Sequence, residues 1–393
     1  MIPIARPVLD EAEVAAASRV ILSGWVTQGP EVAAFEREFA AAVGAPYACA
    51  VSSGTAALHL ALLAVGVAPG DEVVTVSHSF IATANAVRYC QARPVFVDID
   101  PSTFNMDRAQ LERAIGPRTR AILPVHQIGM PCDMESILAI AHRRGLAVVE
   151  DAACAIGAEL RTATGWERVG RPHGDIACFS FHPRKLVTTG DGGMITTANA
   201  DIDARLRALR HHGMSVSDLA RHGAAYVTVE CYPTLGFNYR MTDVQAAIGR
   251  VQLSRLPEML ARRREMACRY HALLDSIRGL GLPVVPEYAR PNWQSYCVRL
   301  PEGRDQLTVM QALLDAAVAT RRGVMCAHRE AAYPRDTWSC GADRDCDGRA
   351  QPCTHLANSE AAQDRTLALP LFDGLSDADQ SRIATELARA CGS

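Results

Sequence analysis

The chain has 393 residues, a formal net charge of −3, and 49% hydrophobic and 21% charged residues. This composition is that of an ordinary folded protein and excludes a long disordered chain. The slightly acidic balance argues against nucleic-acid binding, because proteins that bind nucleic acids carry a basic surface that neutralises phosphates. The length favours two lobes, since single cores stop growing well below it.

Neither the N-terminal segment nor any apolar stretch predicts export or membrane insertion. Residues 1–7 lack the charged start and the apolar core of a signal peptide. The longest apolar stretch, from Ala56 to Ala68, is interrupted by His59 and Gly66 and is too short to cross a bilayer. We therefore expect a cytoplasmic protein with no membrane partner.

Most of the thirteen cysteines lie singly in apolar runs, where a thiol behaves as a small buried hydrophobe. The exception is a polar stretch that holds Cys340, Cys346 and Cys353, with His355 close behind. Its spacing matches no paired zinc-ligand pattern, although a zinc site is one interpretation. We favour an irregular surface insertion and expect no metal.

Short β-rich runs alternate with amphipathic helical patterns through the first part of the chain. The expected strands are Glu72–Ser77, Pro94–Ile99, Ala121–His126, Ala147–Asp151, Ile176–Phe181 and Gly193–Thr197. Helical patterns such as Asp107–Ile115 and Met134–Arg144 lie between them. The alternation predicts an α/β fold with a mostly parallel sheet covered on both faces, and ligands then gather at the carboxyl ends of the strands.

The character of the sequence changes after Arg250. A long helical run from Val251 to Ile277 precedes a break rich in Pro and Gly, and a strand at Gln294–Leu300 and helices at Thr308–Ala317 and Asp377–Ala390 follow. We expect a large domain over residues 1–250 and a smaller α+β domain over residues 251–393.

Three segments carry the candidate chemistry, and the first is Ser52–Leu58. Its small residues open an Ala/Leu-rich helix after a short apolar run. Backbone N–H groups and hydroxyls at such a helix start suit a phosphate. Ordinary helix capping by Ser or Thr is the alternative interpretation.

The second segment is Val148–Ala153, an apolar strand with an acid at its end. A carboxylate in that position, such as Asp151, holds a heteroaromatic ring nitrogen protonated and so makes the ring an electron sink. A helix cap is the alternative role for Asp151. Glu150 points to the other face of the strand and is expected to be structural.

The third segment, Asp175–Lys185, ends a strand, turns at Pro183 and precedes a glycine-rich loop. Lysine is rare in this chain, which carries its positive charge mainly as arginine. A lysine in a partly desolvated pocket is nucleophilic and suits a Schiff base, whereas a solvated loop lysine is the alternative. His126 and His182 also lie near expected strand ends, with no visible charge partner.

Together these segments resemble the DegT/StrS aminotransferases, which have the fold of aspartate aminotransferase (fold type I) and act mainly on sugars. The resemblance covers nearly the whole chain. Further matching motifs are Val26–Val32, Pro69–Val73, Pro124–His126, Gly236–Met241 and Leu369–Phe372. It implies a large domain with a mostly parallel seven-stranded sheet, a smaller α+β domain, and pyridoxal phosphate (PLP) as the cofactor.

The resemblance also implies roles for single residues. Lys185 would hold PLP as a Schiff base, Asp151 would pair with the ring nitrogen, and Phe80 would stack on the ring. The phosphate would be bound by Gly54, Thr55, Ala56 and Ser180, and by Asn238 of the neighbouring subunit in a homodimer with shared active sites. Candidate substrate contacts are Tyr239, Arg240 and His328.

The sequence departs from the family at two places. Cys154 stands where the family usually has Gln or His, which donate a hydrogen bond to the cofactor's ring hydroxyl oxygen, and a thiol is a weaker donor. The second departure is the cysteine-containing insertion from Ser339 to Cys353.

The resemblance implies a ping-pong transamination. An amino acid, glutamate by analogy, would give its amino group to the cofactor, which would pass it to a keto sugar, most readily a nucleotide-linked one. A keto-cyclitol or another carbonyl compound is the nearest alternative acceptor. Two further alternatives are a sugar dehydratase, which would have histidine in place of Lys185, and a non-enzymatic regulatory protein with this fold.

Overall fold

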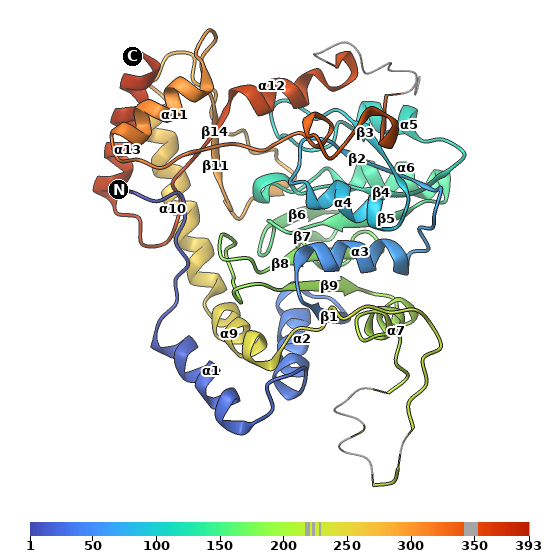
Figure 1. Ribbon diagram of the computed structural model, residues 1–393. Coiled ribbons are helices and arrows are strands. Elements are labelled where there is room, and N and C mark those ends of the chain that lie inside the picture. The colour runs from blue at the N-terminus through green and yellow to red at the C-terminus, as the bar shows by residue number, and fades with distance from the viewer. Residues whose placement is uncertain (217–220, 222–224, 228, 342–352, 393) are drawn as a thin grey trace.

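The computed structural model describes residues 1–216, 221, 225–227, 229–341 and 353–392. A large α/β body surrounds one eight-stranded sheet, and the C-terminal elements gather beside it (Figure 1). The sheet strands are β1 (Tyr47–Val51), β2 (Glu72–Val76), β3 (Arg93–Val97), β4 (Thr119–Leu123), β5 (Ala147–Asp151), β8 (Ile176–Ser180), β9 (Gly193–Thr197) and β13 (Ser339–Cys340).

The order across the sheet is β1-β9-β8-β5-β4-β2-β3-β13. Strand β9 is antiparallel to both of its neighbours, and the other adjacent pairs are parallel. The first 250 residues supply seven of these strands, which is the number that the resemblance implies, and β1 is the one whose range was not expected from the sequence. The eighth, β13, comes from the start of the cysteine-containing segment, whose short extended piece pairs with the edge strand β3.

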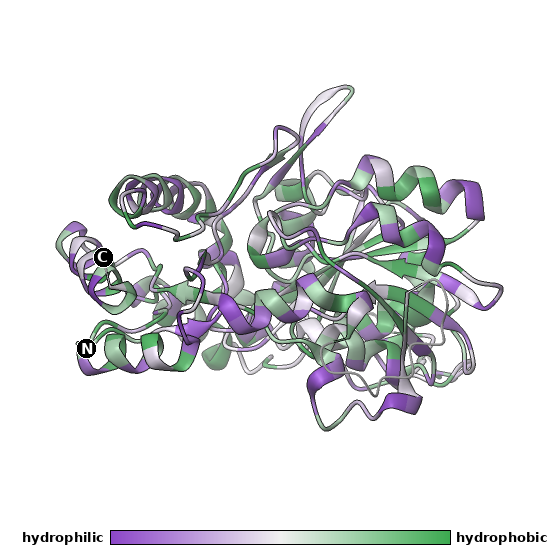
Figure 2. Ribbon diagram, turned by 90° about the horizontal axis from the view of Figure 1, so that it is seen from above, coloured by the Kyte–Doolittle hydropathy of each residue, from purple (hydrophilic) through white to green (hydrophobic). Residues whose placement is uncertain are grey.

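Alternating side chains of the strands enter two separate hydrophobic cores. Val148 belongs to the core under α2 (Pro30–Val43), α5 (Arg108–Ala114) and α6 (Met134–Arg144). Val149 belongs to the core under α3 (Gly54–Ala64), α4 (Ala82–Tyr89) and α7 (Ala200–Leu209). This follows from the two-residue period of a strand and confirms that helices cover both faces. Figure 2 shows the hydrophobic strands between these helices.

The C-terminal part has its own core and its own sheet. Strands β11 (Tyr296–Arg299), β14 (Thr366–Leu369) and β12 (Arg321–Arg322) form an antiparallel sheet. Helices α10 (Leu256–Leu274), α11 (Gln306–Asp315) and α13 (Asp377–Cys391) pack with it around Tyr270 and Tyr296, and Ile2 from the N-terminus joins this core. Helix α12 (Ala357–Arg365) leads into β14.

The single long helix expected from Val251 to Ile277 was wrong. Helix α9 (Asp243–Ser254) ends before Arg255, and α10 begins at Leu256. Pro257 lies in the first turn of α10, where its missing N–H costs nothing, but it cannot continue a preceding helix.

Three smaller features complete the description. A hairpin of β6 (Glu159–Thr162) and β7 (Gly165–Arg168) pairs with β10 (Ala289–Arg290). Helix α1 (Glu11–Ser23) packs against α9. Among the described residues, no helix is both long and apolar enough to span a membrane.

Candidate active site

A cavity of about 1020 Å³ lies at the carboxyl ends of the parallel strands, between the large sheet and the C-terminal elements. The large sheet contributes residues that follow β2, β4, β5 and β8, and the C-terminal part contributes Gln294, Gln306, Arg321 and Asp364. Of the residues expected at the site, Gly54, Thr55, Phe80, Asp151, Cys154, Ser180 and Lys185 line this cavity. The structure therefore brings together most of a set that is dispersed over 130 positions of the chain.

Asp151 ends β5 and is held by two donors. The hydroxyl of Thr83 donates to Oδ2 at 2.7 Å, and the backbone N–H of Ala153 donates to Oδ1 at 3.1 Å. The Thr83 hydroxyl is itself 2.7 Å from the hydroxyl of Ser79. These three side chains are buried, so the carboxylate keeps a fixed orientation at the edge of the cavity.

Lys185 lies in the loop after β8 and is the only lysine of the whole sequence. Its Nζ donates to Sγ of Cys154 at 2.9 Å. Gln294 holds the loop on both sides of this lysine. Its Oε1 accepts from the N–H of Leu186 at 3.0 Å, and its Nε2 donates to the carbonyl of Arg184 at 2.6 Å.

The start of α3 forms the opposite wall. Ser53 caps this helix by accepting from the N–H of Ala56 at 3.1 Å, which is the capping alternative seen in the sequence. The first N–H groups of a helix have no acceptor within the helix. The N–H groups of Gly54 and Thr55 are therefore available to bind an anion at this helix start. Ala56 does not line the cavity.

Gly54 is required by a close approach of two chain segments. A Cβ at this position would lie 2.7 Å from the Cβ of Ser180, well inside the contact limit. The helix start and the end of β8 therefore come together only with glycine here. Ser180 and Thr55 both line the cavity, and the helix start beside them suits a phosphate.

Phe80 lies in the loop after β2 and has 63% of its surface exposed. A phenyl ring left open at a cavity wall is unusual, because aromatic side chains normally bury most of their area. The position suits a flat aromatic ligand inside the cavity.

Asn292 fixes the loop that carries Cys154, and the sequence analysis missed it. Its fully buried Nδ2 donates to the carbonyls of Cys154 at 2.8 Å and Ile156 at 2.9 Å. Thr83 and Gln294 were missed as well. Each acts through a contact with a residue distant in the chain, so no local pattern singles it out.

Glu150 and His126 form a buried pair beside β5, and His126 is also among the residues that line the cavity. The Nε2 of His126 lies 2.9 Å from Glu150, and the N–H of Cys132 donates to Nδ1 at 3.0 Å. Because Nδ1 accepts a hydrogen bond, the ring proton lies on Nε2, which donates a hydrogen bond to the carboxylate of Glu150. Burial raises the pKa of Glu150, but the bonds from His126 and the N–H of Gly174 outweigh it and leave the pKa lowered.

Asn238, Tyr239 and Arg240 lie outside the cavity of their own chain. The Asn238 side chain is exposed, and Nε of Arg240 donates to its Oδ1 at 3.2 Å. The carbonyl of Tyr239 accepts from the N–H of Ser52 at 2.8 Å, which anchors this segment beside the helix start.

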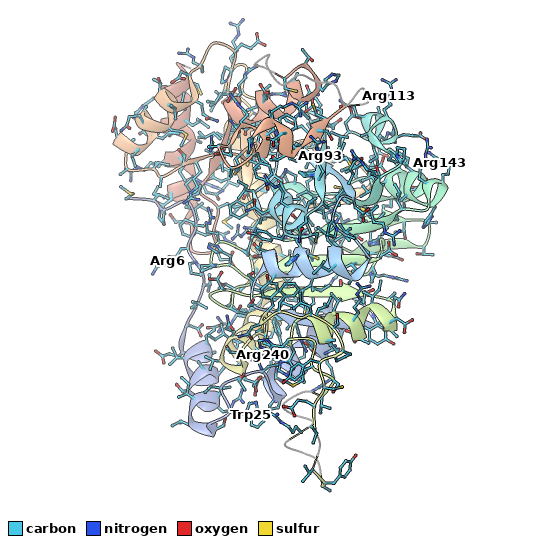
Figure 3. The ribbon with its side chains drawn as sticks, turned by 45° about the vertical axis from the view of Figure 1, so that its right-hand side comes forward. Arg6, Trp25, Arg93, Arg113, Arg143 and Arg240 are labelled. Atoms are coloured by element: carbon cyan, nitrogen blue, oxygen red, sulfur yellow. The ribbon has the colours of Figure 1, made fainter. Side chains whose placement is uncertain are left out.

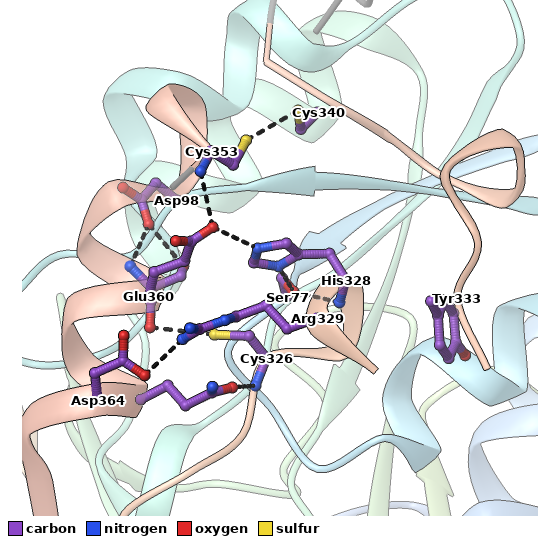
Figure 4. Close-up of polar contacts among 12 residues, drawn as sticks. Ser77, Asp98, Cys326, His328, Arg329, Tyr333, Cys340, Cys353, Glu360 and Asp364 are labelled. Carbon is purple, nitrogen blue, oxygen red and sulfur yellow. Dashed lines mark hydrogen bonds and ion pairs between the residues drawn. The ribbon is translucent and has the colours of Figure 1, made fainter. Parts of the chain in front are cut away.

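His328 also lies away from the cavity, with both ring nitrogens engaged. Nδ1 is 2.6 Å from the Ser77 hydroxyl, and Nε2 is 2.9 Å from Glu360 (Figure 4). Glu360 also accepts from the N–H of Cys353 at 2.9 Å. In this arrangement the ring ties the cysteine-containing segment to the end of β2.

Cys340 and Cys353 are buried with their sulfurs 3.7 Å apart, while Cys346 lies outside the described residues. Within the described part of the chain, no three His, Cys, Asp or Glu side chains are grouped to hold a metal ion.

The chain is similar to several known proteins. A model of the DegT/DnrJ/EryC1/StrS aminotransferase family matches residues 7–388. The spore coat polysaccharide biosynthesis protein SpsC of Bacillus subtilis is 38% identical over 385 residues, 96% of this chain and 94% of SpsC. The crystal structure of DesV from S. venezuelae in complex with a ketimine intermediate is 33% identical, with a TM-score of 0.86 over 100% of this chain and 99% of DesV.

A structure of a Streptococcus pneumoniae protein in its PLP form is 26% identical, with a TM-score of 0.87 over 100% of this chain and 98% of that one. The fold and these similarities define the chain as an aminotransferase with the architecture of PLP-dependent transferases. It belongs to the DegT/DnrJ/EryC1/StrS aminotransferase family, which confirms the resemblance found in the sequence. The family is PLP-dependent, so the expected cofactor is confirmed.

Proposed function

We propose that the protein transfers an amino group from glutamate to the carbonyl carbon of a nucleotide-linked keto sugar. The observation that carries this proposal is the position of Lys185. The only lysine among 40 cationic Lys and Arg residues stands in the cavity, across from a buried carboxylate and a helix start that suits a phosphate. A solvated loop lysine would need none of these neighbours.

The residues of the cavity fit PLP. The narrow approach of Gly54 to Ser180 leaves backbone N–H groups and hydroxyls for its phosphate, Asp151 offers an acceptor for its pyridinium nitrogen, and Phe80 offers a ring face. When bound, the cofactor supplies an electron sink for the carbanion formed at the amino-bearing carbon.

Lys185 has two tasks in this proposal. Its amine binds the cofactor covalently between turnovers, and during turnover Nζ carries a proton between the donor carbon and the cofactor. Gln294 holds the backbone before and after Lys185, so the amine returns to one place. Asp151, fixed by Thr83, keeps the ring nitrogen protonated.

The outer part of the cavity supplies charges for the substrates. Arg321 and Arg322 of β12 line it, and guanidinium groups pair with carboxylates and phosphates in a bidentate manner. They suit the carboxylates of glutamate and the diphosphate of a nucleotide sugar.

We further propose a homodimer in which Asn238 reaches the phosphate in the partner's site. Asn238 is exposed and outside its own cavity, and residues 229–235, which precede it closely, extend from the body of the molecule (Figure 1). The same part of the chain exposes Val227, Val229 and Leu235 by more than four fifths of their surfaces. Exposed apolar side chains in one segment are typical of an interaction surface.

The test uses the single lysine. The holoenzyme is treated with borohydride, digested and analysed by mass spectrometry, and the cofactor adduct is expected on Lys185, with none in Lys185→Ala. Turnover should fall by more than about 1000-fold in that variant. A panel of nucleotide-linked and free keto sugars with glutamate, followed by mass spectrometry, then identifies the acceptor class. No amine-for-ketone mass change with any acceptor contradicts the proposal.

A further inference from the structure

A second cavity of about 910 Å³ lies apart from the active site and shares none of its lining residues. It is bounded by the loop after β3, the turn that follows α10, the end of β11, helix α12 and the end of α13. Helix α12 separates the two cavities, because Asp364 lines the active site and Arg365 lines this one. We call it the arginine cleft.

Four arginines line the arginine cleft, and they come from four separate segments. Arg278 follows α10, Arg299 ends β11, Arg304 precedes α11, and Arg365 ends α12. Glu302 is the only acidic side chain among the lining residues, whereas the chain as a whole has a net charge of −3. A concentration of positive charge in one cleft of an acidic protein requires an explanation.

Internal contacts use little of this charge. Arg365 donates to the carbonyl of Leu300 at 3.0 Å and lies 3.9 Å from Glu302, and Arg299 donates to a carbonyl at 3.5 Å. Among the described residues, no carboxylate forms an ion pair with Arg278 or Arg304, although the guanidinium of Arg304 lies against Gly392. Most of the guanidinium N–H donors therefore face the cleft or solvent.

Helix termini account for part of the charge, but not for all of it. Helices α12 and α13 end at the cleft, and each C-terminus carries about half a unit of negative charge. Together with the carboxylate of Glu302, these partial charges amount to less than the four positive charges of the arginines. The positive charge that is left favours an anion from outside the chain.

We propose that the arginine cleft binds a small molecule that carries a diphosphate group. Guanidinium groups match phosphate oxygens through paired N–H donors, and four of them around one space suit more than one phosphate. The volume admits a molecule of nucleotide size. A nucleoside diphosphate and free pyrophosphate share this chemistry. The assignment does not depend on the proposed function, since the cleft is separate from the cofactor cavity.

The test measures binding of inorganic pyrophosphate, uridine diphosphate and orthophosphate to the PLP-loaded protein by calorimetry. Wild type is compared with Arg278→Glu/Arg304→Glu. The matched control is Arg113→Glu/Arg143→Glu, which makes the same change in net charge at surface positions outside the cleft (Figure 3). All four side chains are exposed, so we expect the substitutions to leave the fold intact, and thermal unfolding verifies this for each variant.

We expect the affinity for pyrophosphate to fall at least tenfold in the cleft variant and less than twofold in the control. Similar affinities for pyrophosphate and uridine diphosphate identify the free anion as sufficient, whereas tighter uridine diphosphate binding identifies a nucleotide. Loss in both variants alike, no pyrophosphate binding, or orthophosphate binding as tight as pyrophosphate overturns the assignment. Any binding in the active-site cavity is unaffected by the cleft variant and is recognised by that property.

Discussion

The amine of Lys185 lies 2.9 Å from the thiol sulfur of Cys154, and the two residues belong to different strand ends of the central sheet. Cys154 follows β5, and Lys185 follows β8, which is the neighbouring strand. Asn292 holds the Cys154 backbone and Gln294 holds the Lys185 loop, so one short C-terminal segment positions both. A change at position 154 therefore acts directly beside the amine that we propose to be reactive.

The first prediction concerns Cys154→Gln. A glutamine amide is a stronger hydrogen-bond donor than a thiol, and in the proposed site it lies beside the cofactor's ring hydroxyl oxygen. One added neutral hydrogen bond contributes about 0.5–1.5 kcal/mol. We therefore expect PLP to bind about 2 to 10 times more tightly, as measured by dialysis against free PLP and absorbance of the bound cofactor.

Cys154→Ala is the control for this change. It removes the thiol without adding a donor, so PLP affinity should stay within about twofold of wild type. Weaker PLP binding in Cys154→Gln than in Cys154→Ala would show that the longer side chain adds no favourable hydrogen bond, and the prediction would be wrong.

The second prediction concerns Thr83→Val, which keeps the shape of the side chain and removes its hydroxyl. The Asp151 carboxylate loses a 2.7 Å donor, and a hydrogen bond to a charged group contributes about 1.5–3 kcal/mol. We expect kcat to fall about tenfold or more, with a smaller change in KM, because Asp151 no longer holds its orientation.

Thr75→Val is the matched control for Thr83→Val. Thr75 is equally buried, but its hydroxyl donates to the carbonyl of Leu123 inside the sheet. Its loss should lower the melting temperature and leave kcat nearly unchanged. Equal effects of the two substitutions on kcat would refute a specific role for Thr83.

The third prediction concerns the pH dependence of stability. The pKa of Glu150 in the folded protein is below its usual 4.5, because the His126 and Gly174 bonds outweigh the effect of burial. A lowered pKa stabilises the fold fully above pH 4.5, and the contribution is lost as the pH falls through the folded-state pKa. Glu150→Gln removes this contribution.

We expect Glu150→Gln to lower the free energy of unfolding by about 1–3 kcal/mol at pH 7, as measured by urea titration. The difference from wild type should shrink as the pH falls below 4.5. Glu135→Gln, at an exposed position of α6, should show neither effect. A difference between wild type and Glu150→Gln that is constant from pH 7 into the acid range would contradict the origin assigned to it.

Local patterns in the sequence predict much of the fold and of the site. Several elements have the expected bounds, namely the strands Ala147–Asp151 and Gly193–Thr197 and the helix Met134–Arg144. In each of them the apolar residues follow a clear pattern that is bounded by turn residues. Lys185 and Asp151 were proposed as site residues for a similar reason, since each lies at or after the end of a strand in a recognisable motif, and both line the cavity. The division into domains at residue 250 stays a prediction.

Residues that act through distant contacts could not be found in this way. Asn292 and Gln294 lie more than a hundred positions from the backbone that they hold, so their role depends on the packing of the C-terminal part. His328 shows the reverse case. The sequence suggested His328 as a substrate contact, but its ring contacts Ser77 and Glu360 and so links two parts of the chain.

The last prediction tests the shared active site. Lys185→Ala lacks the reactive amine, and Asn238→Ala lacks the proposed phosphate contact, so each homodimer is expected to be impaired at both sites. In a mixed dimer, one site combines Lys185 of one subunit with the partner's Asn238 and is intact. Unfolding and refolding an equal mixture should therefore restore activity to about one quarter of wild type, because half of the dimers are mixed and each has one intact site.

The control for this experiment refolds each variant alone, which should restore nothing beyond its own residual activity. Size-exclusion chromatography with light scattering verifies that all samples are dimers. Asn238 is exposed, so its replacement should leave the fold of each subunit unchanged. A mixture no more active than the average of its two parents would mean that Asn238 serves its own subunit or no site at all, and the arrangement proposed for the dimer would have to be abandoned.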